Sequence, residues 1–241
     1  MRKITVLTLL PLLALTGCNK AKVISEAEAK TIIDQINAKQ KESPVNEFKL
    51  IYDENVNGVK ATNLTEYSEP KTYFHILDGN LEAWAYAKDS KYYFVNHDSR
   101  EGTEAKEYYE FGEDGKVVFD LMSEEIKETA NAEYIDFGIL DPEAIKKEYV
   151  PGLEVNFNFQ YTTEGEGSLN MFSEYKWNSE GLTGSIVLKG SYKDYRPYEF
   201  SYLEEGRKDG VSHKEEYTMK YQYTVNPTYP DLTGYTKLSA E

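Results

Sequence analysis

The chain has 241 residues, and its 42 acidic against 27 basic side chains give a formal charge of −15 at pH 7. Because this charge repels phosphates, we exclude nucleic acid as a partner and expect the folded body to stand off an anionic membrane surface. A single cysteine allows no internal disulfide, so the fold needs a hydrophobic core of its own. That core can draw on 21 Tyr, 10 Phe and 2 Trp, a composition that favours β-structure.

The first eighteen residues form a leader-like segment. Arg2 and Lys3 precede an apolar run over residues 4–15, and the only cysteine follows at position 18. The run is shorter than the roughly 20 residues that a membrane-spanning helix needs, and it contains Pro11. A plain secretory signal is the other alternative, but such a signal needs no cysteine.

The sequence Leu15-Thr16-Gly17-Cys18 closely resembles the lipobox of bacterial lipoprotein signal peptides. The resemblance implies that residues 1–17 are removed and that Cys18 carries a diacylglyceryl group, often with a further acyl chain on the new amino terminus. Several acyl chains give a stable anchor, whereas one gives only marginal binding. We therefore expect a lipid-anchored protein on the extracytoplasmic side of the cell membrane. Residues 18–24 would form the lipidated cysteine and tether, and 25 basic against 42 acidic residues leave the mature chain a charge of −17.

The clearest predicted helix follows this tether. Ser25 and Glu28 have the spacing of a capping box, and apolar residues then recur on one helical face. Pro44 ends the pattern, because proline disfavours helical geometry in the residue before it. The helix should therefore cover an apolar surface with Ala29, Ile32, Ile33 and Ile36.

From Asn46 onward the hydrophobic pattern changes to period two, which predicts strands. Glycine turns separate these strands, and repeated tight turns predict an antiparallel meander. The turns are Asn57-Gly58, Asp78-Gly79, Asp114-Gly115, Glu180-Gly181 and Asp209-Gly210. The cleanest strand is residues 153–163, with Leu153, Val155, Phe157, Phe159 and Tyr161 on one face, and Tyr217, Met219, Tyr221, Tyr223 and Val225 repeat the pattern.

A helical insertion is expected between two groups of strands, over about residues 123–149. Ser123 and Asp141 each precede acidic residues, which favours two helix starts and hence two short helices. We expect residues 25–225 to form a single domain and residues 226–241, with two prolines, to form an irregular tail. The predicted fold is thus mainly β (α+β), a large curved antiparallel meander sheet with an N-terminal helix and a mid-chain helical insertion.

The downstream sequence shows no catalytic or metal signature, so we expect a protein that is not an enzyme and has no cofactor and no metal. His75, His97 and His213 stand far apart and in no ligand motif. Adjacent acids such as Glu204-Glu205 point to opposite faces if they lie in a strand. Acidic turns such as Asp78-Gly79-Asn80 lack the spacing of an EF-hand loop and are interpreted as hairpin turns.

The predicted order of elements resembles the half-barrel lipoproteins and carriers of the LolA and LppX type. In that family a curved antiparallel sheet wraps over helices, and a hydrophobic cavity between sheet and helices receives acyl chains. The resemblance covers most of the mature chain but rests on architecture, so no site residue is transferred from it.

Two functions follow from these expectations. The first is a tethered protein that binds or carries a lipid or other amphipathic molecule between the sheet and the helices. Candidate lining residues are Phe157, Phe159, Tyr161, Tyr217, Tyr221 and Tyr223, although ordinary core is the more common role for any one such residue. The second is a non-enzymatic lipoprotein that contacts another envelope protein through its surface and has no internal cavity.

Overall fold

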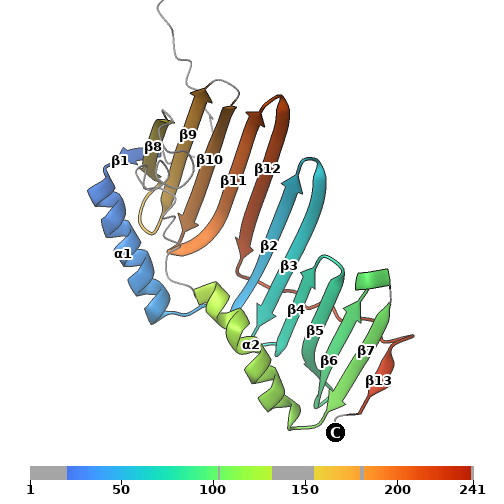
Figure 1. Cartoon of the computed structure of the whole chain (residues 1–241). Helices are drawn as coiled ribbons and strands as arrows, with labels where there is room; N and C mark the ends of the chain where they lie inside the picture. Colours follow the sequence, from blue (N-terminus) through green and yellow to red (C-terminus); the bar gives the residue numbers. More distant parts are fainter. Residues whose placement is uncertain (1–20, 103, 132–154, 180–181, 240–241) are drawn as a thin grey trace, which may run out of the picture.

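The computed structural model describes residues 21–102, 104–131, 155–179 and 182–239. Within them, thirteen strands form one open sheet with two helices against it (Figure 1), which confirms the predicted mainly β fold. The helices are α1 (Glu26–Glu42) and α2 (Gly115–Asn131). The strands are β1 (Lys22–Ile24), β2 (Glu47–Val56), β3 (Val59–Ser68), β4 (Tyr73–Asp78), β5 (Leu81–Lys88), β6 (Lys91–Asp98), β7 (Ala105–Phe111), β8 (Val155–Thr163), β9 (Leu169–Ser179), β10 (Leu182–Lys193), β11 (Arg196–Lys208), β12 (Val211–Gln222) and β13 (Thr236–Leu238), with a 3₁₀ turn at Arg100–Gly102.

Two antiparallel meanders lie side by side in this sheet. Strands β2 to β7 form one and β8 to β12 the other, and they join where β12 pairs with β2. The helices are exchanged between them: α1 precedes the first meander but packs on the second, while α2 precedes the second and packs on the first. Both helices lie on the same face of the sheet, hereafter the helix face (Figure 1).

Helix α1 begins as the sequence predicts. The Ser25 side chain accepts a hydrogen bond from the Glu28 backbone N–H at 3.3 Å, and the Ser25 N–H donates to the Glu28 carboxylate at 2.8 Å. Ala29 and Ile36 are completely buried against the sheet, and Ile32 and Ile33 pack beside them. The predicted apolar face of this helix is therefore confirmed.

Helix α2 begins earlier than predicted. Ser123 was expected to start a helix, but it lies in the middle of α2 and is buried with its hydroxyl bonded to the Asp120 carbonyl. Gly115 was expected in a hairpin turn, but it is the first residue of α2. A Cβ there would lie 2.4 Å from the Tyr92 Cβ, so Gly115 serves close packing instead. The second helix start, at Asp141, lies outside the described residues.

The other glycine turns join paired strands. Gly58, Gly79 and Gly210 have positive φ and connect β2 to β3, β4 to β5 and β11 to β12. The β5–β6 and β10–β11 hairpins contain no glycine in their turns. Their turn residues, Asp89-Ser90 and Asp194-Tyr195, adopt positive φ instead. Residues 180 and 181 lie outside the description, between the paired strands β9 and β10.

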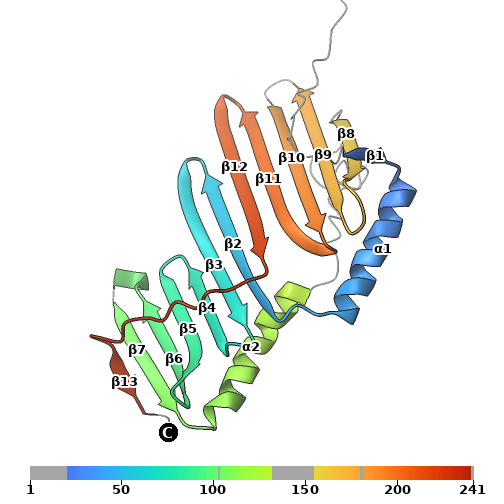
Figure 2. The ribbon, with the colours of Figure 1, turned by 180° about the vertical axis from the view of Figure 1, so that it is seen from behind.

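The C-terminal segment covers the reverse face of the first meander. After β12 the chain crosses behind β3 to β6 (Figure 2) and ends in β13, which pairs parallel to β7. Tyr73, Trp84 and Val95 from the strands pack there against Val225 and Leu232 from the segment. The expected irregular tail is thus coil over most of its length and contains one short strand. It packs against the sheet, and residues 225–239 are hereafter called the strap.

Candidate functional site

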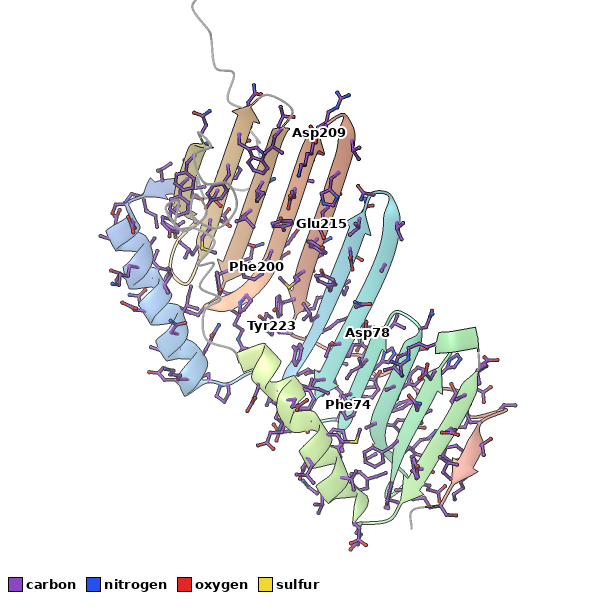
Figure 3. The ribbon with its side chains drawn as sticks, in the orientation of Figure 1. Phe74, Asp78, Phe200, Asp209, Glu215 and Tyr223 are labelled. Carbon is purple, nitrogen blue, oxygen red and sulfur yellow. The ribbon has the colours of Figure 1, made fainter. Side chains whose placement is uncertain are left out.

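An apolar groove of about 520 Å³ lies on the helix face between α2 and the strands β4 to β7. Val118 and Met122 in the first turns of α2 form one wall, and strand residues, among them Phe74 (labelled in Figure 3), form the floor. The volume is within the roughly 300–1,000 Å³ typical of small-molecule sites. Its lining residues are Phe74, Ala83, Trp84, Phe94, Val95, Asn96, Glu107, Tyr109, Phe111, Val118 and Met122.

The groove exists because α2 has more apolar residues than its contact with the sheet can bury. Phe119, Ser123 and Ile126 face the sheet and are buried. Leu121 and Met122 belong to the same turns, yet 67% and 49% of their surfaces remain exposed. A helix in water would normally place polar residues at such positions. This part of α2 therefore presents apolar surface that no described element covers.

The floor of the groove is shaped by aromatic and small residues in register. Phe74 pairs with Ala85, and Ala85 pairs with Phe94 on the next strand. Phe74 stacks on Phe119 of α2 at 5.7 Å between ring centroids, and Phe94 meets Phe111 edge to face at 5.4 Å. Ala85 is completely buried in this cluster, and the alanine that lines the groove is Ala83, which lies opposite Asn96 on β6.

Two polar side chains stand in this apolar surface. Asn96 of β6 and Glu107 of β7 are directly opposite each other in the antiparallel ladder. In the described structure, neither side chain has a hydrogen-bond or ion-pair partner. The arrangement of an apolar groove with few convergent polar groups is typical of a site for a small amphipathic molecule.

The six aromatic residues predicted from the sequence do not line this groove. Phe157, Phe159 and Tyr161 lie on β8, whereas Tyr217 and Tyr221 lie on β12, with three strands between the two. Each group makes local ring contacts. Phe157 meets Tyr175 at 4.9 Å and Phe159 meets Tyr161 at 4.4 Å. Tyr217 stacks on Tyr52 and meets Tyr202 at a tilt, each at 5.6 Å between ring centroids. The structure nevertheless brings Tyr161 together with Tyr221 and Tyr223 in the cluster under α1, whereas Phe157, Phe159 and Tyr217 are not part of that cluster.

Tyr221 and Tyr223 act as packing residues. Tyr221 is 7% exposed beneath α1, and burial raises the pKa of its hydroxyl. Tyr223 lies beyond the end of β12, contacts both helix-face clusters and donates its hydroxyl to the Pro197 carbonyl at 2.6 Å. Val225 was expected on the same face as Tyr223. It packs on the reverse face instead, because the strand ends at Gln222 and the chain turns.

A buried charged network lies behind the groove, on the reverse face. Glu66 accepts hydrogen bonds from Lys49 at 2.7 Å and faces His75 Nδ1 at 3.3 Å, while His75 Nε2 is 2.9 Å from Glu82. Burial opposes the charge on Glu66, but the bonds from His75 and Lys49 prevail and lower its pKa to about 2. The His75 ring also stacks on Trp84 at 4.8 Å.

The strap is fastened to this network through polar contacts. The Tyr73 hydroxyl lies 3.2 Å from Glu66 Oε2 and 3.1 Å from the Thr228 carbonyl oxygen of the strap. The Val225 N–H donates to Glu47 at 2.9 Å, and Lys71 bonds both Glu47 and the Val225 carbonyl. The network therefore fixes the C-terminal segment to β2, β3 and β4.

The described residues contain no group of three or more His, Cys, Asp or Glu side chains that could hold a metal ion. His97 faces Glu104 at 3.2 Å, and His213 lies near Asn57 at 3.3 Å and Glu215 at 3.5 Å. None of the helices in the described part of the chain has the length and hydropathy to span a bilayer. Cys18 and the segment before it lie outside the described residues.

No protein-family model matches the sequence, and no curated protein is similar to it. The site must therefore be interpreted from its own geometry. One signal for the groove was present in the sequence: the apolar pairs Val117/Leu121 and Val118/Met122 recur at i, i+4 beside the buried stripe of α2. They make that helix apolar on more than one face.

Proposed function

We propose that this protein is a membrane-anchored, extracytoplasmic lipoprotein that binds or carries a lipid or other amphipathic ligand in the groove between α2 and β4 to β7. The observation that carries the proposal is the groove itself. It has apolar walls, a volume suited to a small ligand and two polar side chains, Asn96 and Glu107, that have no partner among the described residues. Apolar surface left open in a folded domain commonly marks a binding site.

The proposed anchor is the lipidated Cys18, and the start of the fold restricts how far the domain can move from it. Lys22–Ile24 was expected to be part of the tether, but these residues form β1 at the edge of the sheet. From Cys18 to Lys22 an extended chain reaches about 14 Å. A lipid leaving the bilayer would thus have the domain close by.

The anchor has its own test. Replacement of Cys18 by serine should abolish membrane retention and the incorporation of radiolabelled palmitate, because serine offers no thiol to acylate. Unchanged labelling would refute the anchor while leaving the groove untouched.

The alternative function, a lipoprotein that acts only through contact with another envelope protein, needs no cavity. The groove therefore favours the carrier. The residues in it do not provide a nucleophile with an adjacent base, so the proposed role is binding and not catalysis.

The binding proposal is tested in cells that express the full chain and are fed a photoreactive fatty acid, which enters the membrane lipids. After irradiation, crosslinked peptides are mapped by mass spectrometry. The expected result is crosslinking to the peptides that contain Tyr109, Phe111 and Met122. Crosslinks confined to other parts of the sheet would contradict the proposal.

Two neighbouring substitutions give a matched comparison. Met122→Asp places a charge in the groove, whereas Leu121→Asp places the same charge one residue away, on a side chain that does not line the groove. Both side chains are exposed, so neither change should unfold the protein. Groove crosslinking should fall severalfold in Met122→Asp only; equal losses in both variants would show that the groove is not the binding site.

A further inference from the structure

We propose that the groove selects a membrane lipid whose head group presents a positively charged ammonium. This inference rests on the proposed function and names the class of its ligand. It depends on the position and environment of Glu107, which is the only charged residue among the described residues that line the groove.

Glu107 is positioned to meet a head group. Alternation along β7 places it on the same face as Tyr109 and Phe111, and the β6–β7 register sets it opposite Asn96. The apolar side chains of Phe94, Phe111 and Met122 can accommodate an acyl chain beside it. A ligand lying along this surface would thus bring its polar end to a carboxylate and an amide.

The cations on the elements beside Glu107 have other partners, including Lys237 of the neighbouring strand β13, which pairs with Glu110 at 3.3 Å. Lys106 points to the opposite face of β7 and pairs with Glu104, and Lys91 pairs with Glu110 on that reverse face. On the groove side, Arg100 pairs with Asp98 at 2.6 Å. In the described structure the carboxylate of Glu107 is therefore not neutralised by the protein.

Helix α2, which forms one wall of the groove, does not supply a positive charge to Glu107 either. Lys116, in the first turn of α2, pairs with Asp120 at 2.6 Å on the exposed side of the helix. The positive end of the helix dipole lies at Gly115, but its effect is confined to the first turn. The whole chain is also strongly acidic, which raises the local concentration of cationic ligands and repels anionic ones.

An ammonium group is the chemistry that this arrangement recognises. It has no acceptor that would oppose the carboxylate, and its N–H or N–CH₃ groups can contact both Glu107 and the Asn96 carbonyl oxygen. A sulfate or phosphate group without an ammonium would instead meet a like charge beside apolar walls. The groove therefore discriminates by head-group charge as well as by acyl chain.

The experiment uses three photoreactive probes that share one diazirine-bearing dodecyl chain and differ only in the head group: trimethylammonium, maltoside or sulfate. Each is added below its micelle concentration to membranes that contain the full chain, and labelled peptides from residues 105–124 are quantified. A half-exposed charge contact should favour the ammonium probe over the sulfate probe by roughly fivefold. The maltoside probe should fall between them.

Glu107→Gln is the decisive variant because it removes the charge and keeps the shape. Its ammonium-to-sulfate ratio should fall to about one, while maltoside labelling stays unchanged. Glu124→Gln, at an exposed position of α2, makes the same change of net charge outside the groove and should keep the wild-type ratio.

The outcomes separate the two proposals. Equal groove labelling by all three probes, or a ratio that survives Glu107→Gln, would overturn the head-group inference and leave the binding function standing. A ratio that falls equally in Glu124→Gln would also overturn it, since the effect would then come from net charge. If no probe labels the groove, the proposed function itself fails.

Discussion

The two helices cover the same face of one sheet in different ways. Helix α1 packs tightly on the second meander, where its Ala29 and Ile36 side chains are completely buried among strand residues. Helix α2 lies on the first meander with Phe119 and Ile126 buried, but Met122 stays exposed over a groove. The difference shows that the two helices bury their apolar surface to different extents, since α1 completes a core and α2 leaves an apolar groove open.

The first meander, whose helix face α2 covers only in part, is also packed on its reverse face. The C-terminal strap packs Val225 against Trp84 and Val95 on the reverse face, and the Glu66 network fastens it. Among the described residues, the two clusters of the second meander, one under α1 and one formed by Tyr175, Ile186 and Leu188, contain no residue of the C-terminal segment. The open groove thus lies on the first meander, which is the part of the sheet that the strap covers on its reverse face.

The largest expected effect comes from loosening α1. Ile36→Ala removes a completely buried side chain and should lower the free energy of unfolding by about 2–5 kcal/mol. Leu121→Ala on α2 should change it by less than about 0.5 kcal/mol, because Leu121 is 67% exposed. Urea unfolding followed by circular dichroism measures both. Similar losses in the two variants would mean that the helices are packed alike.

Acid should weaken the half held by the strap. The pKa of Glu66 is lowered from 4.5 to about 2 in the folded state, so its ionised form stabilises the fold above pH 4.5. That contribution, on the order of 3 kcal/mol, is lost as the pH falls from 4.5 through 2. Glu66→Gln should lack this part of the pH dependence of unfolding. An identical slope in wild type and variant would contradict the assignment.

Detaching the strap should have a moderate effect. Tyr73→Phe removes the hydroxyl that links Glu66 to Thr228 and should cost about 1 kcal/mol of stability. The segment after Val225 should then be cleaved faster by a protease under native conditions. Tyr93→Phe is a suitable control, since that ring stacks on Tyr86 in the same cluster and its hydroxyl holds no strap residue. Equal cleavage rates in both variants would show that Tyr73 does not hold the strap.

The smallest effect on stability is expected in the groove. Met122→Asp should change the free energy of unfolding by no more than about 0.5 kcal/mol, because the side chain is 49% exposed. Ligand crosslinking should nevertheless be lost. A large destabilisation, measured by the same urea titration, would mean that Met122 is part of the core and that the groove is not preformed.

The fold was predictable where local chemistry determines it. The capping box at Ser25 and the glycine hairpins at Gly58 and Gly210 were found because each needs a specific residue for a specific backbone geometry. The start of α2 was missed because Gly115 looks like a turn glycine, and only the packing of Tyr92 against it shows otherwise. Strand order across the β12–β2 junction is a long-range pairing that no local pattern encodes.

The candidate site was less predictable than the fold. The aromatic residues of β8 and β12 were chosen for their clean alternation, but alternation reports which face is apolar and not whether that face is covered. Tyr221 is covered by α1, whereas Phe94 and Phe111 border the open groove. The sequence does not indicate which helix covers which meander. The pairing of α1 with the second meander and of α2 with the first is a property of the tertiary structure.

The central claim is that the α2 half binds an amphipathic ligand and the α1 half does not. Amide hydrogen exchange of the full chain, with and without dodecyl maltoside below its micelle concentration, tests it most directly. We expect added protection in residues 115–122 of α2 and in β6 and β7, with α1 unchanged. Protection confined to α1 and β8 to β12, or no change in either half, would contradict the claim.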